Sequence, residues 1–99
     1  MTIDRQNLRL EILKVLYAQT GYVANQEVIL VQLKQQGLII NRDQLHIELA
    51  WLDTTVDCLV DHINGGVHIA NLTGTGMEVV EGSQIIPGIR RPRPDEIPA

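Results

Sequence analysis

The sequence contains no phenylalanine, one tryptophan and two tyrosines, so a hydrophobic core must be built mainly from leucine, isoleucine and valine. Its 99 residues, 44% of them hydrophobic, suffice for one folded domain with a modest core. The single cysteine, Cys58, excludes a disulfide bond within the chain and favours a reducing compartment. No apolar run approaches the roughly 20 residues of a membrane-spanning helix, and the first residues lack the pattern of a secretory signal. We therefore expect a cytoplasmic protein that does not enter a membrane.

Basic residues are also scarce. The sequence has eight lysines and arginines and twelve aspartates and glutamates, which gives a net charge of −4. Residues 1–84 carry five basic and ten acidic side chains, a balance of −5, whereas residues 85–99 carry three arginines and two acids, a balance of +1. DNA affinity that is independent of base sequence comes from cations placed against phosphates. Residues 1–84, the acidic body of the chain, are therefore expected to bind DNA poorly when binding does not depend on base sequence.

Residues 4–19 have the spacing of apolar side chains that predicts an α-helix, with Asp4 as its N-cap. One face should enter the core through Leu8, Ile12, Val15 and Leu16. A second apolar stripe on another side of this helix consists of Leu10, Leu13 and Tyr17. This stripe must be covered either by the tail or hairpin of the same chain or by a second copy of it. In the second case the three residues form a dimer contact.

Two further helices are predicted between residues 25 and 54. Asn25 caps the first, which ends at Gly37, and its apolar side chains are Val28, Leu30, Val31 and Leu33. Asn41 begins the next helix, and Gln44 three residues later fits a capping box. The core side chains of that helix should be Leu45, Leu49 and Leu52. Helix, short turn and helix in this order have the shape of a helix-turn-helix motif.

The outward face of the helix that begins at Asn41 would enter the major groove of DNA in a winged helix. This face consists of Asp43, Ile47, Ala50, Trp51 and Thr54. It has no arginine or lysine, although base readout relies on Arg, Lys, Asn or Gln side chains. The side chains near enough to contact DNA are Arg42, Gln44 and His46. The apolar residues of the face either pack against neighbouring elements or form a surface for a protein partner, which would consist of Ile47, Ala50 and Trp51.

Residues 57–63 and 67–73 alternate and are rich in β-branched side chains, which predicts two strands joined at residues 64–66. With a two-residue turn, one face of the hairpin consists of Val60, His62, Val67 and Ile69. His68 then points to the other side, whereas a three-residue turn would place His62 opposite His68. We favour the two-residue turn because it gathers the three apolar residues on one face, which should be buried.

The C-terminal part should contain a final short helix that begins at Thr73 or Thr75. All four prolines lie in residues 85–99, which are expected to form an extended, polyproline-like tail beside a domain of residues 1–84. This tail is free, or docks through Ile85, Ile86 and Ile89, or binds another protein as a peptide. A further alternative is that it contacts DNA phosphates through Arg90, Arg91 and Arg93.

The sequence contains little that suggests chemistry. Cys58, His62 and His68 are neighbours in sequence, but three ligands on a hairpin fall short of the usual zinc pattern. We find no nucleophile with a base, no phosphate-binding glycine loop and no isolated pair of acids. We therefore expect no metal site, no cofactor and no enzymatic activity.

The order of helices, hairpin and final helix, followed by the segment NLTGTGMEVVEG, resembles winged-helix proteins of the ArsR and MarR type. Three motifs resemble more closely the small winged-helix proteins of Mu-like phages and prophages. These are Trp51-Leu52, the Leu-Thr-x-x-Gly step at residues 72–76 and the Pro-Gly-x-x-Arg-Pro segment at residues 87–92. The resemblance implies an α+β winged helix-turn-helix: a three-helix core, a two-stranded β wing and a short C-terminal helix before the tail. The thiol pair of metal-sensing ArsR proteins is absent, so metal sensing is not expected.

Two functions are compatible with these features. The first is a phage-type transcriptional regulator that binds duplex DNA as a homodimer, with contacts from Arg42, Gln44, His46, Arg90, Arg91 and Arg93. The second is a non-catalytic module that binds another phage or host protein, and not DNA, through Ile47, Ala50 and Trp51. The resemblance favours the first function, which is the primary expectation, with the second as its alternative. The acidic body and the outward face without cations favour the second.

Overall fold

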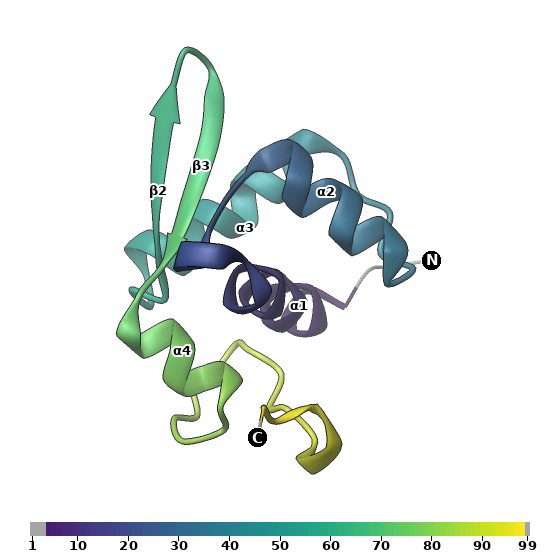
Figure 1. Cartoon of the computed structure of the whole chain (residues 1–99), viewed down its shortest axis with the longest axis vertical. Coiled ribbons are helices and arrows are strands. Elements are labelled where there is room, and N and C mark those ends of the chain that lie inside the picture. The colour runs from purple at the N-terminus through teal and green to yellow at the C-terminus, as the bar shows by residue number, and fades with distance from the viewer. Residues whose placement is uncertain (1–3, 99) are drawn as a thin grey trace.

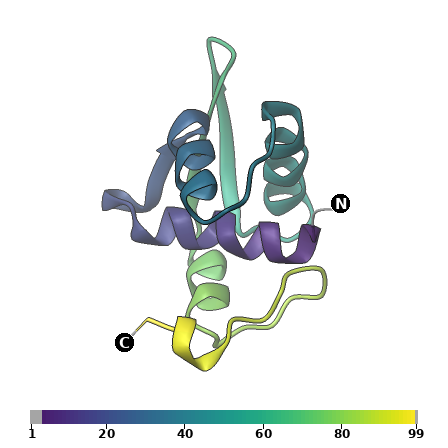
Figure 2. The same ribbon diagram turned by 90° about the vertical axis from the view of Figure 1, so that its right-hand side faces the viewer.

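The computed structural model describes residues 4–98, which form four α-helices and a small antiparallel sheet (Figures 1 and 2). Its helices and strands are, in chain order, α1 (Arg5–Ala18), β1 (Val23–Asn25), α2 (Gln26–Gln35), α3 (Arg42–Thr54), β2 (Leu59–Asn64), β3 (Val67–Leu72) and α4 (Gly74–Val80). Short 3-10 helices occur at Thr20–Tyr22 and Pro94–Glu96. Figure 1 shows α1 in the middle, the β2–β3 hairpin projecting above it, and α4 with the yellow C-terminal segment below.

The helices begin where the sequence predicts. Asp4 and Asn25 each accept hydrogen bonds from backbone N–H groups of the first helical turn. Asn41 and Gln44 form the expected capping box, in which each side chain accepts from the backbone N–H of the other residue. Thr73, one of the two predicted threonines, caps α4. These contacts satisfy N–H groups that the helix itself leaves without a partner.

A third strand that the sequence pattern does not predict lies at one edge of the sheet. β1 has three residues and pairs antiparallel with β3, with Ala24 opposite Ala70. Three residues are too few to show an alternating pattern, which explains why the sequence does not reveal the strand. The strand order is β1-β3-β2, so the expected two-stranded wing is part of a three-stranded sheet.

The hairpin has the predicted two-residue turn but buries the opposite face. Gly65 and Gly66 have φ values of 59° and 81°, as a type I′ turn requires, and His62 lies opposite Ile69. Two valines of the face expected to be buried, Val60 and Val67, are each 38% exposed. The buried hairpin residues are Leu59, Ala70 and Leu72, on the face that contacts α3 and α1. The predicted alternation of side chains along the two strands is confirmed. The face that packs against the helices is decided by tertiary contacts, which the sequence of the hairpin alone does not reveal.

The second apolar stripe of α1 is covered within the chain. Leu10 and Leu13 are fully buried, and α4 packs against α1. Tyr17 is partly buried and donates a hydrogen bond of 2.8 Å from its hydroxyl group to Glu81. Leu10 and Leu13 therefore cannot form the dimer contact suggested from the sequence, because neither side chain is accessible to a second copy of the chain.

The buried face of α2 includes only some of the apolar side chains named from the sequence. Ile29 and Leu33 are fully buried, whereas Val31 is 53% exposed. Val28 and Leu30 are partly buried. The apolar residues of α2 surround much of the helix, so composition alone does not select the face that enters the core.

The C-terminal segment docks on α1 instead of extending into solvent. Ile89 and Pro92 are buried, and the backbone N–H of Arg90 donates to the carbonyl oxygen of Gln6 at 3.0 Å. Ile86 packs against the core, whereas Ile85, also expected to dock, is 60% exposed. Figure 2 shows the segment running beneath α1. The tail predicted over residues 85–99 is thus part of the packed structure as far as residue 98.

The described residues therefore form an α+β structure that is compatible with a winged-helix-like fold. Within residues 4–98 we find no helix with the length and apolar character needed to cross a membrane.

Candidate interaction site

α3 and the hairpin meet at two stacked histidine rings. His46 of α3 and His68 of β3 have ring centroids 3.7 Å apart, with an angle of 16° between the ring planes. Neither ring is fully exposed. The sequence prediction treated His46 as a DNA-contacting residue and placed His68 on the wing, without joining them. The two residues are 22 positions apart, and only the pairing of the strands brings them together.

A glutamine from the start of α2 holds this stack in place. The Oε1 atom of Gln26 accepts a hydrogen bond of 3.2 Å from the backbone N–H of His68 and lies 2.8 Å from the Nε2 atom of His46. Because Oε1 is an acceptor, the Nε2 atom of His46 must carry a proton and donate. Gln26 is 6% exposed, so this contact joins α2, α3 and β3 in a largely buried position.

The other side of His68 faces a carboxylate. The Nδ1 atom of His68 lies 2.9 Å from the Oδ2 atom of Asp61 on β2. The backbone N–H of Asp61 donates to Asp53 of α3 at 3.0 Å. These contacts orient both the rings and the hairpin relative to α3, so the hairpin is attached to the helix by polar groups as well as by apolar packing.

Two exposed isoleucines are neighbours of the stacked histidines along the strands or the chain. Ile63 lies directly opposite His68 in the hairpin, and paired residues share one face of a sheet. Ile47 follows His46 in α3. Ile63 is 67% exposed and Ile47 is 57% exposed, and Ala50 of α3 is also exposed. We call Ile47, Ala50 and Ile63 the junction surface, which is apolar and has no charged member.

The predicted DNA contacts of α3 are engaged in other interactions. Arg42 forms an exposed ion pair of 2.6 Å with Glu27 of α2. The Oε1 atom of Gln44 accepts the N–H of Asn41 in the capping box, and His46 belongs to the stack. A cation neutralised by a neighbouring carboxylate adds little to the attraction for phosphate.

The three tail arginines that were predicted to contact DNA differ in how strongly they are engaged within the chain. Arg90 donates to Asn7 at 2.7 Å and to both carboxylate oxygens of Glu96 at 2.8 and 2.9 Å. Arg93 is largely exposed and lies 3.2 Å from Glu96. Arg91 is exposed and has no side-chain ion pair within the described residues. Arg90 therefore supports the structure, and only Arg91 and Arg93 present accessible cations.

Trp51 is largely occupied by contacts within the chain. The guanidinium carbon of Arg9 lies 3.8 Å from the centroid of the Trp51 ring, a cation–π contact. Gly88 approaches the ring closely, since a Cβ atom at Gly88 would lie 2.9 Å from two of its carbons. Trp51 thus packs between α1 and the C-terminal segment. Of the three residues predicted for a protein partner, Ile47 and Ala50 remain exposed.

Cys58 is fully buried, and burial raises the pKa of its thiol to about 11. The thiol is therefore protonated and unreactive at neutral pH. Within residues 4–98 no three His, Cys, Asp or Glu side chains are grouped closely enough to hold a metal ion.

Together, these features define a small α+β domain in which α3 and the β2–β3 hairpin each present exposed apolar side chains near the stacked histidines. The chain belongs to the same family as gp26, an uncharacterized protein of Escherichia phage Mu. The two are 31% identical over 71 residues, which cover 72% of this chain and 73% of gp26. No family model matches the chain, and no solved structure matches it.

Proposed function

We propose that this protein is a non-catalytic, winged-helix-like interaction module of a Mu-like phage, and that it binds another phage or host protein through the junction surface. The observation that carries the proposal is the exposure of Ile47 and Ile63 near the half-buried His46–His68 stack. Large apolar side chains held at a rigid, uncharged position are typical of protein interfaces.

The distribution of charge supports a protein partner over DNA. The α3 cation nearest the junction surface is neutralised by Glu27, and Asp43 lies exposed on the outward face of α3. Arg91 and Arg93 belong to the C-terminal segment. Figure 1 shows this segment below α1, on the side opposite to the projecting hairpin. A duplex placed against α3 would therefore meet few free cations.

A DNA-binding regulator remains the second candidate, because Arg91 and Arg93 are exposed and belong to the basic part of the chain. In that case binding to random duplex DNA should weaken steeply with salt. Replacing both arginines with alanine should then remove the binding. We expect no salt-dependent binding at low ionic strength.

The test of the proposal is affinity capture from cells in which a Mu-like prophage is induced. The wild-type protein is compared with Ile47→Asp and Ile63→Asp, and captured proteins are quantified by mass spectrometry. The matched control is Ile85→Asp, since Ile85 is 60% exposed and belongs to the segment after α4. Figure 1 shows this segment at the end of the molecule opposite to the tip of the hairpin. We expect one partner to be retained by the control and lost with both junction variants. Equal recovery of every protein by all four forms would overturn the proposal.

A further inference from the structure

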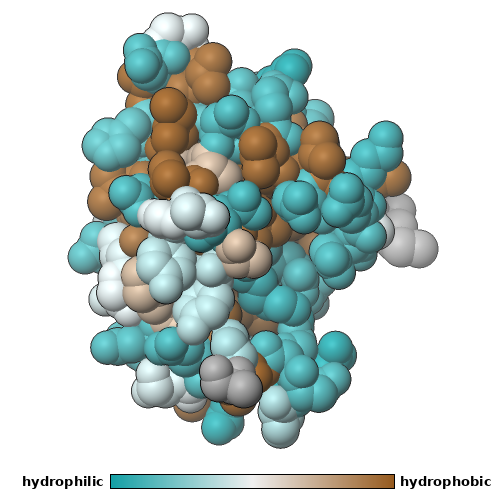
Figure 3. Space-filling view, in the orientation of Figure 1, coloured by the Kyte–Doolittle hydropathy of each residue, from teal (hydrophilic) through white to brown (hydrophobic). Residues whose placement is uncertain are grey.

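The face of the sheet that points away from α3 carries no charged residue. Alternation along the three strands places eight side chains on it: Val23, Asn25, Val60, His62, Asn64, Val67, Ile69 and Asn71. We call this set the outer sheet face. Its three valines are each 38–39% exposed. In Figure 3 hydrophobic atoms, coloured brown, lie over the hairpin and reappear over α2.

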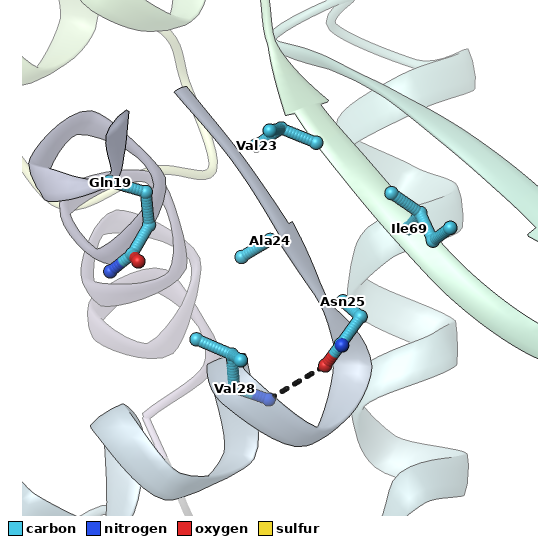
Figure 4. A pocket seen from close by; sticks show the side chains of 6 residues that line it. All are labelled: Gln19, Val23, Ala24, Asn25, Val28 and Ile69. Carbon is cyan, nitrogen blue, oxygen red and sulfur yellow. Dashed lines mark hydrogen bonds between the residues drawn. The ribbon is translucent and has the colours of Figure 1, made fainter. Parts of the chain in front are cut away.

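This face continues into a hollow around β1. The hollow has a volume of about 330 Å³ and is lined by Gln19, Val23, Ala24, Asn25, Val28 and Ile69. In Figure 4 Val23 and Ile69 lie on one side of β1, and Gln19, Ala24 and Val28 lie on the other. A second hollow of about 250 Å³ shares Val28 and is also lined by Glu27, Val31 and Gln32 of α2, so it contains a charged residue and lies outside the outer sheet face. The uncharged surface therefore runs from the hairpin to the hollow around β1.

We propose that the outer sheet face is the contact between two copies of this chain, related by a two-fold axis. In such a contact the same surface meets itself, so a charge near the axis faces its own copy. The chain carries a net charge of −4, and two copies repel each other wherever their charges meet. A surface made of apolar and neutral polar side chains avoids that repulsion.

The shape of the face suits the same arrangement. The exposed Val60 lies on β2, at one edge of the sheet, whereas the hollow lies around β1, at the other edge. A two-fold axis that lies in the plane of the face, along β3, places β2 of each copy over the hollow of the other. Apolar side chains that fill hollows of a partner contribute most of the binding energy in such contacts.

This inference goes beyond the proposed function, because it uses the opposite face of the sheet. α3 and the junction surface stay exposed in both copies, so the dimer would present two junction surfaces. Two linked binding sites strengthen attachment to a partner that is itself repeated. The dimer contact expected from α1 is replaced by one on the sheet.

The experiment measures the mass of the purified protein by sedimentation velocity at concentrations from about 1 μM to 1 mM, a range that covers weak and moderate self-association. We expect the wild-type mass to rise from one copy towards two. Val60→Asp and Val67→Asp should each raise the dissociation constant at least about tenfold, because a carboxylate would then be buried without a partner. Ile47→Asp and Ile85→Asp are matched controls outside the outer sheet face and should behave as the wild type.

Circular dichroism establishes that each variant is folded. If an aspartate variant unfolds, Val60→Thr and Val67→Thr keep the branched shape that suits a strand while adding a hydroxyl group, and the double threonine variant should still weaken the dimer. A wild-type protein that stays monomeric throughout the range would overturn the proposal. So would a dimer that the folded aspartate or threonine variants leave unchanged.

Discussion

Gly76 occupies a position with no room for a larger side chain. It lies in the first turn of α4, where a Cβ atom would overlap the carbonyl oxygen of Cys58 and the Leu72 side chain. That carbonyl accepts a hydrogen bond of 3.1 Å from the backbone N–H of Thr73, so it cannot move away without breaking the bond. The close approach of α4 to the segment before β2 thus requires glycine at this position, independently of any special φ value.

Gly76→Ala should therefore lower the free energy of unfolding by about 2 kcal/mol, the usual cost of an overpacked site. Gly74→Ala is the matched control, because a Cβ atom at Gly74 would meet nothing within 4 Å. Since alanine restricts the unfolded chain, this control should be neutral or stabilising by up to about 1 kcal/mol. Urea unfolding of both variants measures the difference, and equal stabilities would contradict the steric argument.

At the scale of elements, α1 and α3 are joined by a buried carboxylate. Glu48 of α3 is 3% exposed and pairs with Arg9 and Arg5 of α1, each at 2.8 Å. Arg9 is itself 9% exposed, covers Trp51 and donates to the carbonyl oxygen of Gly88 at 2.9 Å. The guanidinium group of Arg9 on α1 thus contacts both α3 and the C-terminal segment, and its charge is compensated by Glu48.

Glu48→Gln should lower the free energy of unfolding by about 3 kcal/mol, because it leaves the buried charge of Arg9 without its counterion. Glu27→Gln breaks the exposed pair with Arg42 and should cost less than about 1 kcal/mol. Thermal or urea unfolding of the two variants gives the comparison. Similar losses for both would mean that burial of Glu48 has no special energetic role.

At the scale of the whole molecule, the C-terminal segment is held on α1 by Glu96. Its carboxylate accepts from both terminal nitrogens of Arg90 and lies 2.7 Å from the ammonium group of Lys14. These donors, Arg90 first, hold the pKa of Glu96 well below its usual range. Because the pKa is depressed in the folded state, the stabilisation is present above the unfolded pKa and is lost as pH falls through the folded one.

Glu96→Gln should therefore reduce the free energy of unfolding at pH 7 by about 2 kcal/mol, as expected for a lost hydrogen-bonded charge. The difference from the wild type should persist down to about pH 5 and shrink below about pH 4, where unfolded glutamate takes up a proton. Asp95→Asn is the control, since the Asp95 side chain is 77% exposed and lies 3.6 Å from Arg93. Urea unfolding across this pH range tests the sign, and a difference that grows on acidification would refute it.

Several features of the fold could be predicted because they depend on residues close in sequence. Helix caps act within three or four positions, so Asp4, Asn25 and Asn41 were recognisable from the chain alone. The two-residue turn follows from adjacent glycines that accept positive φ. Of the candidate site, the exposed Ile47 was predicted, but Ile63 was not, because its exposure depends on how far the hairpin projects.

The amino-acid sequence by itself determined the helix starts, the hairpin turn and the acidic charge balance, since each arises locally or from composition. Tertiary structure decided which face of the hairpin is buried, that Leu10 and Leu13 are covered by the same chain, and that Arg90 binds Asn7 and Glu96. Arg90 and Asn7 are 83 residues apart. Contacts over such separations depend on how all elements pack together, and no periodic pattern in the chain records them.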